Sequence, residues 1–138
     1  MTPTELREQS HRFALQVGKF CDALPKDPRT QEIAHQLHNS AHSAAMNYRA
    51  VCRAHTPKLF ISKLCIVVEE SDEAQGWLET LLANGKGGQE TIRLLKEATE
   101  LVKLFTASKH TWLKNEAARI AAKKQQNAKG RSRRRQDL

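Results

Sequence analysis

The stretch TPKLFISKLCIVVEESDEAQGWLETLLANG, residues 56–85, decides the fold of this chain. It opens with Thr56-Pro57, a helix cap followed by proline at the first helical position, and it closes with Asn84-Gly85, a left-handed stop. Between these signals apolar side chains point almost all the way round a helix axis. The alternative is a buried strand over Phe60–Val68, but no second strand-like run exists to pair with it. The stretch therefore predicts a long helix.

Similar signals divide the rest of the chain. Thr2-Pro3-Thr4-Glu5 is a capping box that starts a first helix, and Asp27-Pro28 caps a second. Gly85–Gly88 is a turn, after which a fourth helix starts near Gln89. Long helices joined by short connections run antiparallel. The sequence predicts an all-α fold, an antiparallel up-down-up-down four-helix bundle over residues 1–122.

Composition agrees with a single helical domain. Aromatic residues make up only 5% of the 138 residues, and few residues are β-branched. The three cysteines are odd in number and lack C-x-x-C spacing, so we expect buried thiols in a reducing compartment. No apolar leader starts the chain and no apolar run is long enough to span a bilayer. A cytoplasmic protein without a membrane partner is the expectation.

Helical periodicity predicts one core-facing stripe on each helix. The expected core positions are Leu6, Phe13, Val17, Phe20 and Leu24; Ile33, Leu37, Ala44, Tyr48 and Val51; Phe60, Leu64, Val67 and Leu78; and Ile92, Leu95, Val102, Phe105 and Trp112. The third and fourth helices carry further apolar side chains outside these stripes. A helix that is apolar beyond one arc is buried on a second side. We therefore expect a homo-oligomer interface formed by Leu59, Ile66, Trp77, Leu94, Leu101 and Leu104.

Nearly all the net charge lies at the end of the chain. Residues 114–138 hold nine basic and two acidic side chains, a net +7 out of +8 for the whole chain. This composition predicts a disordered basic tail, residues 123–138, that suits the phosphates of a nucleic acid. A purely solubilising tail is the alternative. The cations expected to bind are Lys123, Lys124, Lys129, Arg131, Arg133, Arg134 and Arg135.

The bundle offers little chemistry by comparison. Glu8-x-x-His11 and Glu32-x-x-His35 have the spacing of di-iron bundles, but helical geometry places them on solvent-facing sides. His38 and His42, one turn apart, have the spacing to chelate a surface metal together with Glu69, Glu70 or Glu73 of the antiparallel neighbouring helix. A solvated polar face is the more common outcome. No nucleophile–base pattern exists, so we expect no catalytic, cofactor or metal residues and no enzyme.

One set of motifs resembles a known family. Ser40-x-x-Ser43 is followed by Asn47-Tyr48-Arg49-x-x-Cys52-Arg53-Ala54, then Phe60–Leu64, then Glu70-x-Asp72-Glu73-x-x-x-Trp77-Leu78. This order is similar to that of bacterial four-helix-bundle proteins first noticed as products of intervening sequences in large-subunit ribosomal RNA genes. The resemblance runs from about Leu6 to Ala107. Two departures are Ala44-Ala45-Met46, where the family has a glycine, and Ala50, where an acid is common.

The resemblance implies a small cytosolic bundle that assembles into a ring of five subunits and has no established enzymatic activity. A related branch is the accessory protein of diversity-generating retroelements, whose basic ring binds a reverse transcriptase and nucleic acid. In this chain Arg49 and Arg53 lie one turn apart, and Lys63 follows across the hairpin. They form either a basic patch for a polyanion or salt bridges to acids of a neighbouring protomer.

The sequence thus favours a non-catalytic homo-oligomer that binds RNA or DNA. The alternative function is a structural or protein-interaction scaffold, such as an adaptor for a reverse transcriptase or other polymerase.

Overall fold

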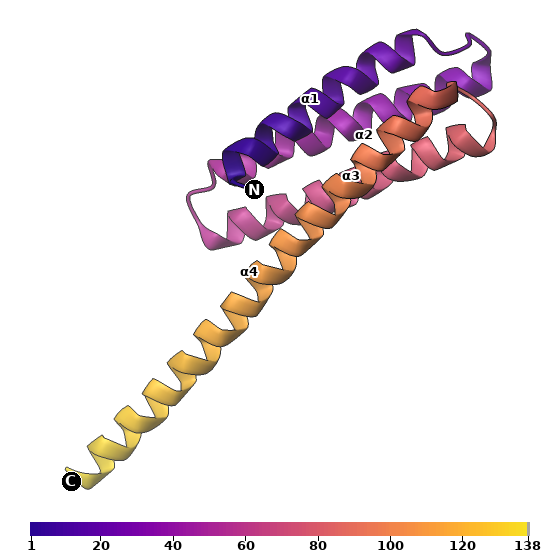
Figure 1. Ribbon diagram of the computed structural model, residues 1–138. Helices are drawn as coiled ribbons and strands as arrows, with labels where there is room; N and C mark the ends of the chain where they lie inside the picture. Colours follow the sequence, from indigo (N-terminus) through magenta and orange to yellow (C-terminus); the bar gives the residue numbers. More distant parts are fainter. Residues whose placement is uncertain (138) are drawn as a thin grey trace. The chain divides into compact units, whose positions relative to one another are not determined.

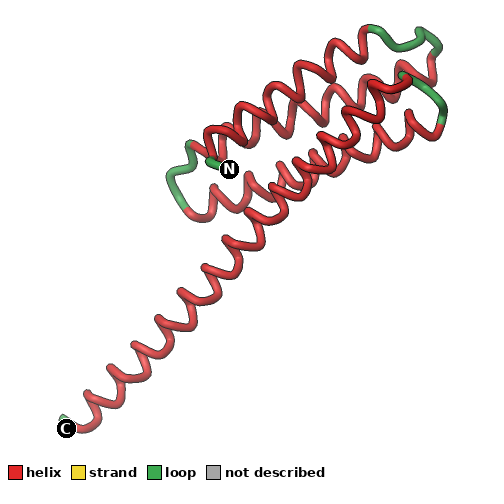
Figure 2. The backbone as a smooth tube through the Cα atoms, viewed as in Figure 1, coloured by secondary structure: helices red, strands yellow, loops and turns green. Residues whose placement is uncertain are grey.

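A computed structural model describes residues 1–137. It contains four α-helices: α1 (Pro3–Asp22), α2 (Pro28–Cys52), α3 (Pro57–Ala83) and α4 (Gly88–Gln136). No strand occurs among the residues described, and the predicted all-α class is confirmed. Packing divides the chain into two units, Met1–Thr106 and the part from Ala107 onward. Figures 1 and 2 show α1, α2, α3 and the first part of α4 side by side in the first unit.

The helices begin where the sequence predicts. The Thr2 hydroxyl accepts a hydrogen bond from the Glu5 amide, and the Glu5 carboxylate accepts one from the Thr2 amide, which completes the capping box. The Asp27 carboxylate accepts a hydrogen bond from the Thr30 amide, and the Thr56 hydroxyl accepts one from the Leu59 amide, so each caps its helix through a single bond. Each cap satisfies backbone N–H groups that have no partner within the helix, so the three prolines that follow occupy favourable positions.

The core confirms the predicted stripes of α1 and α2. All ten predicted positions on these two helices and the linker that follows α1 are buried, as are Leu64, Val67 and Leu78 of α3. Helices α1 and α2 run antiparallel, because the Cys21 thiol contacts the Ala34 carbonyl while Gly18 lies beside His38 farther along α2. Gln75 on α3 donates to the Thr99 hydroxyl on α4 at 3.0 Å, which fixes those helices side by side.

The core stripe of α4 differs from the prediction. The buried positions are Thr91, Leu94, Ala98, Leu101 and Phe105, whereas Ile92 is 37% exposed. Leu95 and Val102 are only half-buried. The observed stripe alternates steps of three and four residues, the spacing that keeps one side of a helix against its neighbours. This stripe includes a threonine and an alanine. The larger apolar side chains on the adjacent face of α4 therefore give the stronger hydrophobic pattern in the sequence.

The end of α4 also corrects the sequence-based expectation. Residues 123–136 are helical, where the composition predicts a disordered tail. Lysine, arginine, glutamine and alanine are all strong helix formers, and cations in the last turn stabilise the negative end of the helix dipole. The side chains of residues 117–137 are exposed, as expected of a segment that adds no core. Local helix propensity therefore determines its structure.

The cysteines are only partly as expected. Cys21 and Cys65 are half-buried, but Cys52 at the end of α2 is exposed. Burial, with a smaller contribution from the neighbouring Asp22, raises the pKa of the Cys21 thiol to about 11. This thiol is therefore protonated and unreactive near neutral pH. No helix in the part of the chain that the structure describes combines the length and apolar character needed to cross a membrane.

Candidate nucleic-acid interface

The basic segment, which we define as Lys123–Arg135, displays its cations on a helix. Its seven lysine and arginine side chains are exposed, and none forms an ion pair within residues 1–137. Arg119, one turn earlier, differs because it forms a salt bridge with Glu116 at 2.6 Å. At about 1.5 Å per residue the segment is roughly 18 Å long. Duplex DNA carries about ten phosphate charges over that length.

The cations of the basic segment are unevenly distributed around the helix axis. At 100° per residue, five of them fall within an arc of about 120°, and the other two point elsewhere. The five are Lys123, Lys124, Arg131, Arg134 and Arg135. One duplex would therefore meet about four or five of the seven. Two pairs, Lys129–Arg133 and Arg131–Arg135, have i,i+4 spacing, at which like charges repel. A polyanion that approached the segment would relieve this repulsion.

The three predicted cations of the first unit lie on α2 and α3. Arg49 is half-buried in the last turn of α2, Arg53 is the exposed cap residue that follows, and Lys63 is half-buried on α3. None forms an ion pair within residues 1–137. The structure thus leaves these charges available to a polyanion or to a second protomer.

The predicted oligomer interface needs correction on α4. Leu94 and Leu101 are 0% and 2% exposed and belong to the core of the chain itself, so they cannot contact another subunit. On α3, Leu59 is 40% exposed, and Ile66 and Trp77 are half-buried. Leu104 is half-buried against the core. The α3 positions therefore remain accessible, whereas two α4 positions do not.

The accessible apolar face of α4 contains positions that the sequence pattern predicts to lie in the core. Ile92, Leu95 and Val102 lie along it. An open cleft of about 450 Å³ runs beside this face and is lined by Ile92, Leu95, Lys96, Thr99, Glu100 and Lys103. The three-four spacing of Thr91, Leu94, Ala98, Leu101 and Phe105 was the signal that could have identified the outward face.

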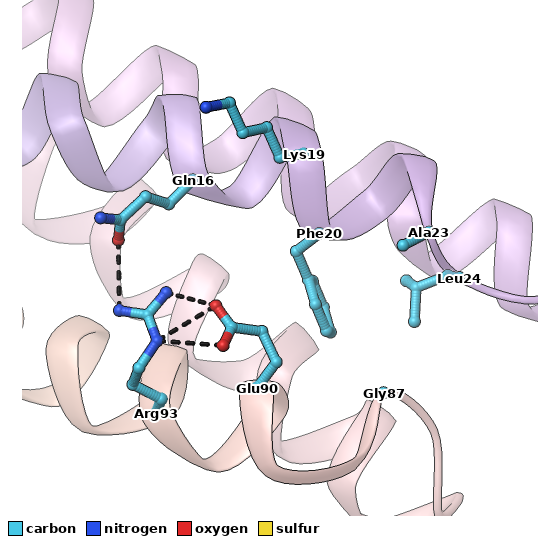
Figure 3. A pocket seen from close by; sticks show the side chains of 8 residues that line it. All are labelled: Gln16, Lys19, Phe20, Ala23, Leu24, Gly87, Glu90 and Arg93. Carbon is cyan, nitrogen blue, oxygen red and sulfur yellow. Dashed lines mark hydrogen bonds and ion pairs between the residues drawn. The ribbon is translucent and has the colours of Figure 1, made fainter.

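A second open cleft, of about 400 Å³, lies between α1 and the start of α4 (Figure 3). The Arg93 guanidinium lies at its rim and binds the Glu90 carboxylate with two nitrogens. The same side chain donates to Glu97 at 3.3 Å and to Gln16 at 3.4 Å. This pairing lowers the pKa of Glu90 and raises that of Arg93. Because the Arg93 cation is already matched by acceptors, it is poorly suited to bind a further anion.

A di-iron site in a four-helix bundle requires ligands that project into the bundle. Glu8, His11, Glu32 and His35 all lie on the surface, as helical geometry predicts. Across residues 1–137, no three His, Cys, Asp or Glu side chains are placed to hold a metal ion together. His38 and His42 lie against α1, where Gly18 and Ala14 are their neighbours.

Comparison with known proteins supports the fold alone. No family model and no curated protein matches the chain. Among solved structures, it is similar to a protein of unknown function from the S23 ribosomal protein family of Bacteroides thetaiotaomicron, with a TM-score of 0.72 and 23% identity. The match covers 80% of this chain and 99% of that one.

Proposed function

We propose that this chain is a non-catalytic, homo-oligomeric up-down-up-down bundle that binds nucleic acid through its basic segment, Lys123–Arg135. The observation that carries the proposal is the set of seven exposed cations without acidic partners within residues 1–137. Such a segment binds phosphates through charge, and it needs no base-specific contact. Arg49, Arg53 and Lys63 add positive charge on the first unit.

The oligomer is proposed to form through the outer apolar positions of α3 and α4. Leu59, Ile66 and Trp77 supply the α3 side, while Ile92, Leu95 and Val102 replace Leu94 and Leu101 on the α4 side. Accessible apolar side chains beside an open cleft favour contact with another protein surface. The family resemblance implies five subunits. Such a ring would place several basic segments on one nucleic acid and raise their effective concentration.

Fluorescence anisotropy with labelled RNA and DNA of mixed sequence tests the proposal. Binding that falls steeply with salt, depends weakly on sequence and needs the basic segment would support it. The second candidate is a protein-interaction scaffold, for example for a reverse transcriptase or another polymerase. It is favoured by the same accessible apolar positions, and absence of nucleic-acid binding at low salt would select it.

A further inference from the structure

Two histidines on α2 form a pair that faces α1. His38 and His42 are one helical turn apart, and their ring centroids are separated by 4.3 Å with the planes tilted by 35°. A Cβ atom added to Gly18 would lie 3.8 Å from Cδ2 of His38, so this imidazole lies over the Gly18 backbone. His42 forms a hydrogen bond with the backbone of Ala14, one turn earlier on α1. Both rings are therefore held at the α1–α2 seam.

The surroundings of His42 at this seam favour its neutral ring. Burial is the largest cause that lowers the pKa of the His42 imidazole, and the neighbouring His38 and His11 act in the same direction. The hydrogen bond to Ala14 acts in the opposite direction, as expected when a ring N–H donates to a carbonyl. A neutral ring that donates from one nitrogen has a lone pair on the other. In metal sites, the same type of second hydrogen bond orients a ligating histidine.

We propose that His38 and His42 bind a divalent transition-metal ion of the zinc and nickel class. Two histidines at i and i+4 on one face of a helix are an established arrangement of zinc ligands. Imidazole suits zinc, copper and nickel, whereas magnesium and calcium require oxygen ligands. The two ring centroids lie 4.3 Å apart, a separation at which one metal ion can contact both imidazoles.

The site would be open. Since no three potential ligands are grouped anywhere in residues 1–137, the two imidazoles supply the protein ligands, and water completes the coordination shell. His11, exposed on α1, influences His42 electrostatically and is the neighbouring imidazole. Glu69, Glu70 and Glu73 of α3 are not part of the proposed site.

Calorimetric titration of the full chain, free of any affinity tag, with Zn²⁺ and Ni²⁺ tests this proposal. The wild type is expected to bind one ion per chain and to melt at a higher temperature with the ion present. His38→Gln and His42→Gln should each weaken binding at least about tenfold, the loss that removal of a supporting group alone can cause at metal sites. His35→Gln is the matched control, because this exposed imidazole of α2 bonds to Asn39 and lies outside the His38–His42 pair.

Circular dichroism establishes that each variant is folded at the titration temperature. Retention of wild-type affinity by either His38→Gln or His42→Gln would overturn the proposal. An equal loss in His35→Gln would also overturn it, since binding would then not depend on the pair. His38→Gln leaves the bond between His42 and Ala14 in place and so keeps the test valid if His42→Gln is unstable.

Discussion

The ring of Tyr48 on α2 lies 5.0 Å from that of Phe105 on α4, centroid to centroid, at an interplanar angle of 47°. Tilted aromatic pairs at this separation stabilise a core beyond the area that they bury. Burial raises the pKa of Tyr48 to about 12, so its hydroxyl is protonated at neutral pH. The pair joins two helices that are not consecutive in the sequence.

Loss of the Phe105 ring should therefore destabilise the first unit strongly. Phe105 is completely buried, and Phe→Ala substitutions at such sites cost about 3–5 kcal/mol. Leu113→Ala, at an exposed position of α4, should change stability by less than about 0.5 kcal/mol. Urea denaturation followed by circular dichroism compares the two. Equal midpoints would show that the aromatic contact does not stabilise the fold.

A glycine closes the turn between α3 and α4. Gly87 has φ of 82°, and a Cβ atom there would lie 2.6 Å from the Phe20 ring and collide with Oγ1 of Thr91. Gly87→Ala is expected to cost more than about 1 kcal/mol, because the left-handed backbone and the contact both oppose the methyl group.

Gly76 provides the matched control for this substitution. It lies within α3, and nothing would contact its Cβ within 4 Å. Gly76→Ala should stabilise the chain by about 0.5–1 kcal/mol, since alanine favours the helix. The melting temperatures of Gly87→Ala and Gly76→Ala should therefore shift in opposite directions. Shifts of the same sign would contradict the different roles of these two glycines.

The start of α2 should respond to acid. The Asp27 carboxylate accepts a hydrogen bond from the Thr30 amide at 3.0 Å, and this bond lowers its pKa below the usual 3.8. A lowered pKa gives a stability contribution that is present above 3.8 and is lost as the pH falls through the folded-state value. In Asp27→Asn the cap persists without titrating. As the pH falls, the melting temperature of Asp27→Asn should decrease less than that of the wild type. Equal decreases in the two proteins would show that titration of Asp27 does not affect stability.

Much of the fold is predictable from residues that have one dominant preference. Thr2, Asp27 and Thr56 each precede a proline, and these combinations fixed three helix starts. On α4, Ile92 and Leu94 are almost equally apolar, so composition could not decide which one faces the core. The choice depends on Thr91 and Ala98, whose small size lets α4 approach its neighbours. That information lies in packing and not in hydropathy.

The candidate site shows the same division. The position and sign of the basic segment are evident from the sequence, because seven cations lie between Lys123 and Arg135. Its charge density predicts disorder, whereas the helix propensity of its residues favours the helix that the structure contains. The pairing of His38 and His42 with α1 depends on how the helices dock, which spacing along a single helix does not determine.

Accessible apolar positions on α3 and α4 should control self-association. Wild-type protein is expected to have a mass several times 15.6 kDa in size exclusion with light scattering. Leu59→Asp and Ile92→Asp should reduce that mass while the helical content persists, because both side chains lie at the surface. Leu15→Asp, at an exposed position of α1, is the control and should leave the mass unchanged. A monomeric wild type at micromolar concentration would refute the interface.

The basic segment should produce binding to nucleic acid that weakens steeply with salt. Because five of its seven cations lie within one arc of about 120°, a duplex would meet about four or five, which implies a log–log slope of affinity against salt near −4 for each engaged segment. Deletion of residues 123–138 should remove most of the affinity and flatten the slope. The deletion should leave the melting temperature nearly unchanged, since the described side chains of this segment are all exposed. A variant with Lys129, Arg131 and Arg133 replaced by glutamine keeps the length and the helix formers, so it separates charge from chain length. If this variant binds RNA and DNA as tightly as the wild type, the segment is not the binding element.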